Sequence, residues 1–525
     1  MNDGKICVSV CGETAEEMLD KITSANEFAD IVEVRFDCLD REQLNIFISK
    51  ISDLKFEKPI LATFRPSEQG GKQDLSLTER LKFWARLLHS SRPELLIDIE
   101  AEPAIATAVT TRNLPRIVSH HDFRGVPDNI ASIFDGVASA FTPDIVKIAV
   151  SAYDITDTIS VWNLIENARE TETRIIPIAM GDAGKWTRIL GLAHGAFLTY
   201  ASLDSGDETA PGQVTAGDLA NLYRVKRLDR ETKVFGILGD PVSQSLSTYM
   251  HNPAFVSEGF NGVFIPFLVK DIDEFMRRMV RPETREVELN FGGFSVTMPH
   301  KQSIMKHLDT IDPTAKRIGA VNTVKVDADG KLFGYNTDAH GFITPLKAKY
   351  GDLKGAKVAV FGAGGAARAC VYSLKQEGAI VEVFVRDIAK SRGFGEEFDV
   401  RIFQISDFRF RHSNSDPLNR RSEDENPQVD IIVDTTPLGM SGQFENDSLF
   451  SADELKGVKF VYDLVTKPND TPIIREAKKA GIPAIGGLEM LVAQGAKQFE
   501  IWTGKVAPVE DMKTAVLARF AELNK

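Results

Sequence analysis

Eight short apolar runs, spaced through the first 203 residues, constrain the fold of this chain more than any other feature. Most are separated by helix-like stretches such as 75–88 and 161–170. Buried-looking strands that alternate with helices pair in parallel, and eight such units in about 220 residues are typical of a (β/α)8 (TIM) barrel. The expected strands are 6–10, 31–36, 59–65, 95–100, 116–123, 145–150, 174–180 and 197–203.

Composition narrows the class of protein. A net charge of -13 argues against a broadly basic nucleic-acid surface, so the expected partners are small molecules met by local Arg or Lys. No apolar run reaches the roughly 20 residues of a membrane helix. The N-terminus resembles neither a signal nor a transit peptide, and the four cysteines lack zinc-type spacing. We therefore expect a cytoplasmic protein with free thiols and no metal.

Lys147 stands out because it lies in the apolar run Asp144-Ile-Val-Lys-Ile-Ala-Val150. Burial among apolar groups lowers the pKa of an ammonium group, and a neutral amine can attack a carbonyl to form an imine. The alternative is a lysine that reaches water at the rim. The preceding strand ends in His120 and His121, and a base beside an imine suits carbanion chemistry. The pattern alone does not say which histidine points inward.

These strand-end motifs resemble those of type I 3-dehydroquinate dehydratase over about 6–228. The resemblance implies that Lys147 forms the imine and that His121 moves the proton. It also implies a carboxylate ligand in Arg188, which the planar guanidinium supports independently. The other substrate ligands implied are Glu33, Arg35 and Arg65 for ring hydroxyls, and Thr209 and Gln213 on a closing loop.

The chain departs from that family at one place. A glutamate commonly precedes the Gly-Gly after the third strand, whereas this chain has Gln69 in Glu68-Gln-Gly-Gly71. If that glutamate tunes the histidine, a neutral glutamine lowers the pKa of the imidazolium. Glu68 could compensate by a shift of one residue, and the sequence leaves this open.

A glycine-rich turn marks the second half. Lys357-Val-Ala-Val-Phe-Gly-Ala-Gly-Gly-Ala-Ala-Arg368 joins a strand to a helix, an order that lets backbone amides approach a pyrophosphate. A tight structural turn is the alternative. The next strand ends in Arg386, which suits a 2′-phosphate and favours NADP(H), although Asp387 follows it. The residues expected at the cofactor are Gly362, Ala363, Gly364, Gly365, Ala366, Arg386, Lys390, Thr435 and Met440.

Five further motifs resemble shikimate dehydrogenase from Val234 onward. The resemblance implies that Lys301 and Asp338 are the catalytic pair, in which the cation stabilises charge on a carbonyl oxygen. The substrate ligands it implies are Ser245, Ser247, Thr297, Asn322 and Gln494. Thr248 stands where the family commonly has a proline, and Thr466 stands where it commonly has a tyrosine. The resemblance implies that the loss of the tyrosine loosens the positioning of the substrate.

The whole chain therefore resembles the bifunctional 3-dehydroquinate dehydratase/shikimate dehydrogenase family. The expected α/β architecture is a barrel at 1–228, a substrate-binding lobe at 234–347, a Rossmann NADP-binding lobe at 348–488 and returning helices at 489–525. We expect a last barrel helix within 223–233 and a solvated loop at 409–428. The alternatives are quinate dehydrogenase activity in the second half and a catalytically inactive regulator, which the retained site residues disfavour.

Overall fold

The computed structural model describes residues 3–51, 55–90, 95–110, 114–243, 245–412 and 429–523. By their contacts the residues divide into two compact units. The first contains Met1–Ser245 and Asn261–Phe291, and the second contains Leu246–Phe260 and Gly292–Lys525.

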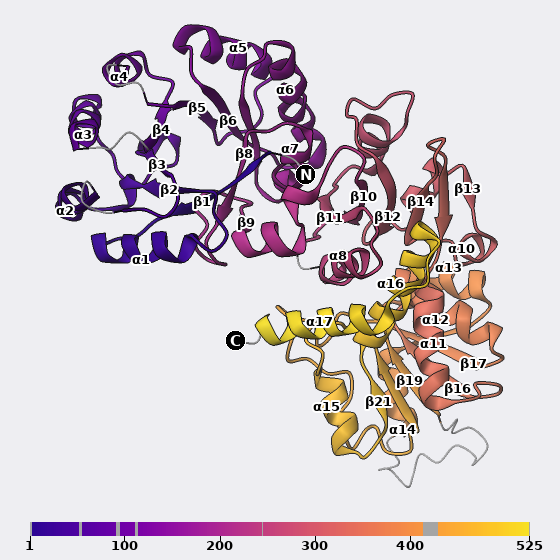
Figure 1. Cartoon of the computed structure of the whole chain (residues 1–525). Helices are drawn as coiled ribbons and strands as arrows, with labels where there is room; N and C mark the ends of the chain where they lie inside the picture. The colour runs from indigo at the N-terminus through magenta and orange to yellow at the C-terminus, as the bar shows by residue number, and fades with distance from the viewer. Residues whose placement is uncertain are drawn as a thin grey trace. The chain divides into compact units, whose positions relative to one another are not determined.

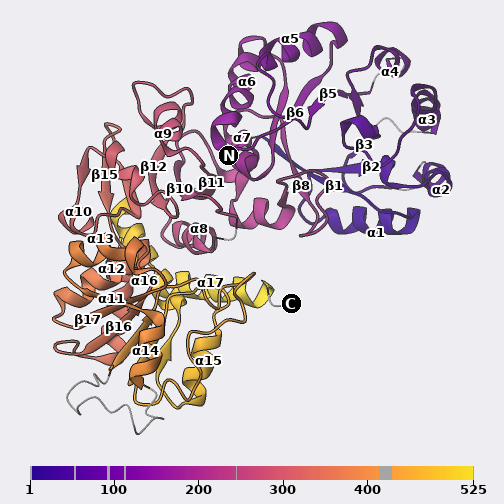
Figure 2. The ribbon, with the colours of Figure 1, turned by 180° about the vertical axis from the view of Figure 1, so that it is seen from behind.

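Parallel strands in chain order form the predicted barrel (Figures 1 and 2). Strands β1 to β7 are consecutive neighbours, and β1 also pairs in parallel with β8. Between β8 and β7, the Phe197 N–H donates to the Ile175 carbonyl oxygen at 2.9 Å. Each predicted strand matches an observed one within two residues at either end. The strands are β1 Lys5–Val10, β2 Ile31–Arg35, β3 Ile60–Thr63, β4 Leu95–Glu100, β5 Arg116–Asp122, β6 Ile145–Ser151, β7 Ile175–Met180, β8 Leu198–Ser202 and the short β9 Val214–Thr215.

Seven helices follow the first seven strands and lie on the outer side of the sheet in both views. They are α1 Ala15–Ala25, α2 Arg41–Ile51, α3 Leu77–Ser90, α4 Pro103–Val109, α5 Ile130–Phe141, α6 Thr158–Glu170 and α7 Lys185–His194. The interior is filled by one apolar residue row from each strand, including Ile145 and Ala149 of β6. Because side chains alternate along a strand, Lys147 lies in that same interior row.

Two local predictions need correction. The segment 223–233 does not form a last helix: a π-helical turn at Asp218–Leu222 and a 3-10 turn at Val225–Arg227 are separated by Arg224, whose φ of 52° is left-handed and interrupts helical geometry. Within 409–428, residues 409–412 belong to helix α14, Ile405–His412, instead of a loop. The remaining residues, 413–428, lie outside the described part of the chain.

The prediction that all four cysteines are free thiols is wrong for two of them. Cys11 and Cys38 form a disulfide, while Cys7 and Cys370 are free and buried. Cys11 follows β1 and Cys38 follows β2, and these strands are paired neighbours in the sheet. Parallel strands end at the same edge, so the two Cα atoms lie only 5.5 Å apart despite 27 residues of separation.

The second module begins in the first unit, where β10 (Lys233–Gly239) and β11 (Gly262–Leu268) pair in parallel and are followed by α9 (Ile272–Phe275). In the second unit, β14 pairs antiparallel with β12 and β15, and β15 pairs in parallel with β13. These elements are α8 Ser247–Ser257, β12 Phe291–Val296, β13 Thr310–Ile311, α10 Pro313–Ile318, β14 Thr323–Val326, β15 Leu332–Tyr335 and α11 Asp338–Tyr350.

A parallel sheet in the order β18-β17-β16-β19-β20-β21 forms the Rossmann lobe. Alternate residues of β16 face opposite sides: Val358 and Val360 pack with α11, α12 and α16, whereas Ala359 and Phe361 pack with α14 and α15. Helices on both faces explain the continuous apolar strands. The elements are β16 Lys357–Phe361, α12 Gly365–Gln376, β17 Ile380–Val385, α13 Ile388–Phe398, β18 Arg401–Gln404, β19 Ile431–Asp434, β20 Phe460–Asp463, α15 Pro472–Lys479, β21 Ala484–Ile485, α16 Gly487–Thr503 and α17 Val509–Leu523.

Among the described residues, no helix combines the length and apolar character needed to cross a membrane.

Candidate active sites

One cavity at the mouth of the barrel brings together all eight residues predicted for the first site. They come from the ends of β2, β3, β5 and β6, from α7 and from the segment before β9. The lining residues are Glu33, Arg35, Arg65, His121, Lys147, Arg188, Thr209 and Gln213, together with Gln69, Gly70, Phe123, Ala149, Ile178, Met180, Tyr200 and Ala210. In parallel barrels the C-terminal strand ends carry the chemistry, and this cavity lies at those ends.

Lys147 is buried, but its surroundings are not purely apolar. Its Nζ lies 2.8 Å from Asp98 and 3.9 Å from Glu33, and it also lies 4.0 Å from the centre of the Tyr200 ring. The expected burial of Lys147 is confirmed, but its nitrogen has charged partners that were not predicted. Residues 145, 146 and 148–150 flank Lys147 along the strand with apolar side chains. Its charged partners come from β4 and β2, and the spacing of residues in the sequence does not reveal that these strands lie close to it.

His121, not His120, lines the cavity. On β5 it shares the inward parity of Ile117 and Ser119, so the two-residue period of the strand selects it. Burial lowers the pKa of His121 well below its ordinary value, and the nearby Arg65 and Lys147 lower it further. The imidazole is thus neutral near pH 7, and its Nδ1 has no hydrogen-bond partner among the described residues.

Gln69 occupies the cavity wall where a glutamate was expected from the family pattern. Its Oε1 is buried and has no hydrogen-bond partner in the described part of the chain. Glu68 does not take over the place, because its carboxylate pairs with Arg80 at 3.4 Å and its side chain is 61% exposed. The family-like carboxylate is therefore absent from this wall.

Arg188 is a buried cation whose Nη2 donates to the Pro211 carbonyl oxygen at 3.3 Å. Its Nε and Nη1 are buried without partners among the described residues, and burial lowers the pKa of the guanidinium to about 10. A buried guanidinium that lacks a counter-charge and lines a cavity is suited to bind an anionic group.

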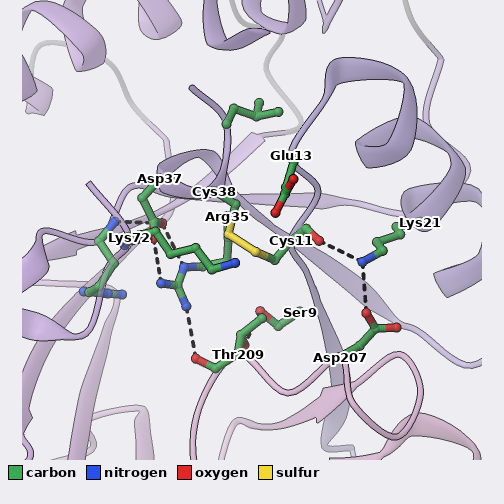
Figure 3. The surroundings of a disulfide bond; sticks show 12 residues. Ser9, Cys11, Glu13, Lys21, Arg35, Asp37, Cys38, Lys72, Asp207 and Thr209 are labelled. Carbon is green, nitrogen blue, oxygen red and sulfur yellow. Dashed lines mark hydrogen bonds and ion pairs between the residues drawn. A yellow bond between two sulfur atoms is a disulfide. The ribbon is translucent and has the colours of Figure 1, made fainter. Parts of the chain in front are cut away.

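The closing segment after β8 is tied to the rim by Thr209 (Figure 3). Its hydroxyl donates to Ser9 Oγ at 2.8 Å, its N–H donates to Gln213 Oε1 at 2.7 Å, and its carbonyl oxygen accepts from Arg35 at 3.5 Å. Arg35 is held in turn by Asp37 through two bonds of 2.8 and 2.9 Å. The polar groups of this rim are thus fixed by each other before any ligand arrives.

The second candidate site contains the predicted pair. Lys301 Nζ lies 2.5 Å from Asp338 Oδ2, and the Asn322 side chain donates to Asp338 Oδ1 at 2.8 Å. Thr337 joins the cluster by accepting from Asn322 at 3.0 Å and contacting Gln494 Oε1 at 3.5 Å. Lys301, Asp338, Asn322 and Gln494 therefore meet at one place.

The remaining predicted ligands lie in α8 and after β12. Ser247 is buried at the first position of α8, Ser245 is half-buried two residues earlier, and Thr297 is half-buried just after β12. A residue that the sequence patterns missed, Gln498, braces the floor of this region: it accepts from Ser295 at 3.0 Å and donates to Thr323 at 3.1 Å. Gln498 follows Gln494 by one helical turn on α16, which is the signal that could have found it.

The glycine-rich turn leaves an open cradle beside the Lys301–Asp338 pair. Gly362 has a φ of 105°, and a Cβ there would lie 2.5 Å from Thr435 Oγ1. Gly364 has no neighbour within 4 Å of a Cβ position, and Gly365, at the N-terminus of α12, lies next to the side chain of Lys301. Gly364 is the N-cap residue of α12 and has no side chain that could bond the first amides of the helix, which suits a pyrophosphate site.

Arg386 and Lys390 are exposed beyond the end of β17. Asp387 is occupied as the N-cap of α13, where it accepts from the Lys390 N–H at 3.1 Å and lies 3.8 Å from Lys390 Nζ. Because the Asp387 carboxylate already caps a helix, it is less available to bind a ribose hydroxyl. The residues after β17 therefore favour a cofactor with a phosphorylated ribose. Thr435 and Met440 follow β19; the Thr435 hydroxyl donates to the Phe361 carbonyl oxygen at 2.7 Å, and Met440 is exposed.

Two carboxylates, Asp434 and Asp463, are buried at the ends of the paired strands β19 and β20. Asp434 accepts from the Thr436 N–H at 2.8 Å, and Asp463 accepts from the Val465 N–H at 3.0 Å and from the Thr471 hydroxyl. Burial raises the pKa of Asp434 well above its ordinary value, with Asp463 adding to the effect, and burial raises the pKa of Asp463 to about 6. The sequence patterns did not indicate this pair of carboxylates.

These features define a two-part enzyme class: a parallel barrel with a buried lysine and a neutral histidine, and a dinucleotide-binding module with a lysine-aspartate pair. The family model of type I 3-dehydroquinase matches residues 6–230. Models of the shikimate dehydrogenase substrate binding domain and the shikimate 5′-dehydrogenase C-terminal domain match residues 237–324 and 487–517.

Curated relatives agree with these matches. The chain is 33% identical over 97% of its length to a chloroplastic bifunctional 3-dehydroquinate dehydratase/shikimate dehydrogenase of Arabidopsis thaliana, of which it covers 83%. It is 36% identical over 56% of its length to the whole of an NADP(+) shikimate dehydrogenase of Methanocaldococcus jannaschii. A Geobacter enzyme of the same description is 42% identical over 55% of this chain and 97% of its own. The chain belongs to the bifunctional 3-dehydroquinate dehydratase/shikimate dehydrogenase family.

Proposed function

We propose that this protein catalyses two consecutive steps of the shikimate pathway. The barrel, residues 1–228, dehydrates 3-dehydroquinate to 3-dehydroshikimate through an imine on Lys147. The lobes at 234–347 and 348–488, with the helices at 489–525, reduce 3-dehydroshikimate to shikimate with NADPH. The observation that carries the proposal is the convergence of Lys147, His121 and the unpartnered Arg188 in one cavity.

In the first reaction, Arg188 binds the substrate carboxylate, because it is a buried cation without a counter-charge. Lys147 condenses with the ketone, and the resulting cationic imine accepts the electrons released when a proton leaves the adjacent carbon. His121, held neutral by its lowered pKa, takes that proton and then protonates the departing hydroxyl. The ring hydroxyls are bound by Glu33, Arg35 and Arg65 and covered by Thr209 and Gln213.

In the second reaction, NADPH supplies the hydride when bound at the glycine turn and at Arg386 and Lys390. Lys301 Nζ faces the carbonyl oxygen of the substrate, stabilises the charge that develops there and gives it a proton. Asp338 keeps the ammonium oriented through the 2.5 Å contact, and Asn322 holds Asp338. Ser245, Ser247, Thr297 and Gln494 bind the carboxylate and hydroxyls of the substrate.

Trapping with borohydride in the presence of 3-dehydroquinate, followed by mass mapping, tests the first activity. We expect the adduct on Lys147 and abolished dehydration in Lys147→Ala, while NADPH oxidation with 3-dehydroshikimate survives. Lys185→Ala is the matched control, since Lys185 lies in the same barrel and pairs with Asp182 at 2.7 Å on the surface. An adduct on another lysine, or loss of both activities from folded Lys147→Ala, would contradict the proposal. Parallel assays with shikimate and quinate exclude or establish a quinate dehydrogenase.

The location that we propose is the cytoplasm, with small molecules as the only partners of the two sites. Disulfides are rare in reducing compartments, so the Cys11–Cys38 pair should be found as thiols there and as a disulfide after isolation in air. Alkylation of freshly lysed cells before purification measures this. A pair that resists alkylation in the cell would place the protein in an oxidising compartment.

A further inference from the structure

Asp98, on β4, is a fully buried carboxylate that the sequence patterns did not single out. Its Oδ2 lies 2.8 Å from Lys147 Nζ and 2.8 Å from Arg65 Nη2, and its Oδ1 accepts from the Ser119 hydroxyl at 2.7 Å. The Tyr200 hydroxyl lies 3.5 Å from Oδ2. Burial by itself raises the pKa of the Asp98 carboxyl, but Arg65 and Lys147 outweigh it, so the group is ionised.

Glu33, the carboxylate that lines the cavity, lies farther from Lys147 than Asp98 does. The oxygens of Glu33 accept from Ser9 and, at 2.9 Å, from Thr63, and the nearer one is 3.9 Å from Lys147 Nζ. Gln69, which also lines the cavity, is neutral. Asp98 is thus the direct counter-charge of the lysine nitrogen.

The charge of that nitrogen is the same before and after condensation. An ammonium group and a ketone give a cationic imine and one water: the C–N bond forms, the carbonyl C–O bond breaks, and the oxygen leaves with two of the ammonium protons. The overall step neither releases nor takes up a proton. A buried site that holds one positive charge on this nitrogen therefore suits both states, and a lysine already neutral at rest is not required.

We propose that Asp98 is a positioning residue of the dehydratase, which acts through Lys147. It holds the lysine nitrogen and Arg65 in place, and it keeps the imine protonated so that the imine remains an electron acceptor. This inference rests on the proposed imine chemistry and deepens it. A buried charge pair is costly unless its geometry is good, and breaking one partner leaves the other charge uncompensated.

The test is the pH profile of Asp98→Asn, which keeps the shape of the side chain and removes its charge. We expect kcat for 3-dehydroquinate to fall by about 100-fold or more, since the loss of a buried counter-charge is of that order. The alkaline limb of kcat should also move to lower pH by about one unit or more, because the imine loses its proton more readily. A purely structural loss would lower kcat without moving the limb.

Asp122→Asn is the matched control. Asp122 follows His121 on the same rim, but its carboxylate pairs with the exposed Arg124 at 2.7 Å and does not line the cavity. We expect its kcat within about twofold of the wild type and an unmoved limb. If Asp98→Asn does not fold, Ser119→Ala serves instead: it removes one donor to Asp98 and one acceptor of Arg65, and it should lower kcat about tenfold.

The outcomes separate this inference from the function on which it rests. Absence of a borohydride adduct in the wild-type chain would overturn the imine chemistry itself. A wild-type adduct on Lys147, combined with an unmoved alkaline limb in Asp98→Asn or with an unchanged kcat in Ser119→Ala, would overturn the role of Asp98 alone.

Discussion

Breaking the Cys11–Cys38 disulfide should destabilise the barrel and leave the second unit intact. The bond closes a loop that contains α1 and β2, between cysteines 27 positions apart in the sequence (Figure 3). In the chain-entropy description, a loop of that length contributes 298 K × (2.1 + 1.5R ln 27) cal/mol/K, which is about 3.5 kcal/mol. With a urea slope of about 3 kcal/mol/M for a domain of this size, Cys38→Ser should lower the unfolding midpoint by about 1 M.

Tryptophan fluorescence follows this transition well. Three of the four tryptophans, Trp84, Trp162 and Trp186, lie in the first unit, and only Trp502 lies in the second. The same measurement on the wild type with a dithiol reductant should reproduce the shift, whereas the reductant should not shift Cys38→Ser further. Dehydratase activity should be lost at lower urea in the variant, and the NADPH-dependent activity at an unchanged concentration.

A midpoint within about 0.2 M of the wild type in Cys38→Ser would refute the magnitude derived from loop entropy. An equal shift of both activities would refute its confinement to the barrel. The second result would also mean that unfolding of the barrel is coupled to that of the other unit.

Further predictions concern three ionisable groups and the cofactor. Because the pKa of His121 is lowered below 6.5, its ring stays neutral in the folded chain at a pH where the unfolded chain takes up a proton. We therefore expect kcat for dehydration to stay level through pH 6.5. The free energy of unfolding of the barrel should fall as the pH drops below that value. An acid limb centred at or above pH 6.5 would contradict the assignment. Arg386→Ala should raise the KM for NADPH at least tenfold, because a charge-assisted contact to the 2′-phosphate is lost, and should leave the KM for NADH within about twofold. An equal rise of KM for both cofactors would contradict the assignment of Arg386 to the 2′-phosphate. The raised pKa values of Asp434 and Asp463 mean that the folded chain binds more protons than the unfolded chain. The pair therefore lowers the free energy of unfolding progressively as the pH rises from about 4 to above 6, and the loss is complete at higher pH. Asp434→Asn should accordingly raise the free energy of unfolding at pH 8 by on the order of 2 kcal/mol and change it little at pH 4. An equal change at both pH values would count against a raised pKa of Asp434.

The barrel could be predicted because its signal is local. Each strand is a short apolar run bounded by polar residues, and the alternation of strands with helices dictates parallel pairing. Residues 223–233 show where local signals fail: they are charged and rich in helix formers, yet Arg224 adopts a left-handed conformation that ends helical geometry. Intrinsic helix propensity is a weak predictor of structure in a segment that is long enough for only one helical turn.

The first site could be predicted in its membership but not in its electrostatics. Lys147 was conspicuous as a charge in an apolar strand, whereas its partner Asp98 lies inside β4, a strand of similar character, 49 residues earlier. The observed pairing depends on the order of β4, β5 and β6 and on the inward parity of each residue. The disulfide was hidden in the same way, although Cys11 and Cys38 follow neighbouring parallel strands by one and three residues, and this spacing could have indicated it.

The charges gathered at the barrel mouth explain why its ligand should carry one negative charge. The ionised groups in or against the cavity are four cations and three anions, His121 being neutral: Arg35, Arg65, Lys147 and Arg188 against Glu33, Asp37 and Asp98. The excess of one positive charge resides on Arg188, the one cation of this set that has no anionic partner among the described residues. A single carboxylate completes the pairing, and because the lysine nitrogen keeps its charge on condensation, the balance persists through the imine. Uncharged analogues that lack the carboxylate would leave Arg188 buried and unpaired, and they should bind more weakly by at least the cost of such a group, a factor of about 100.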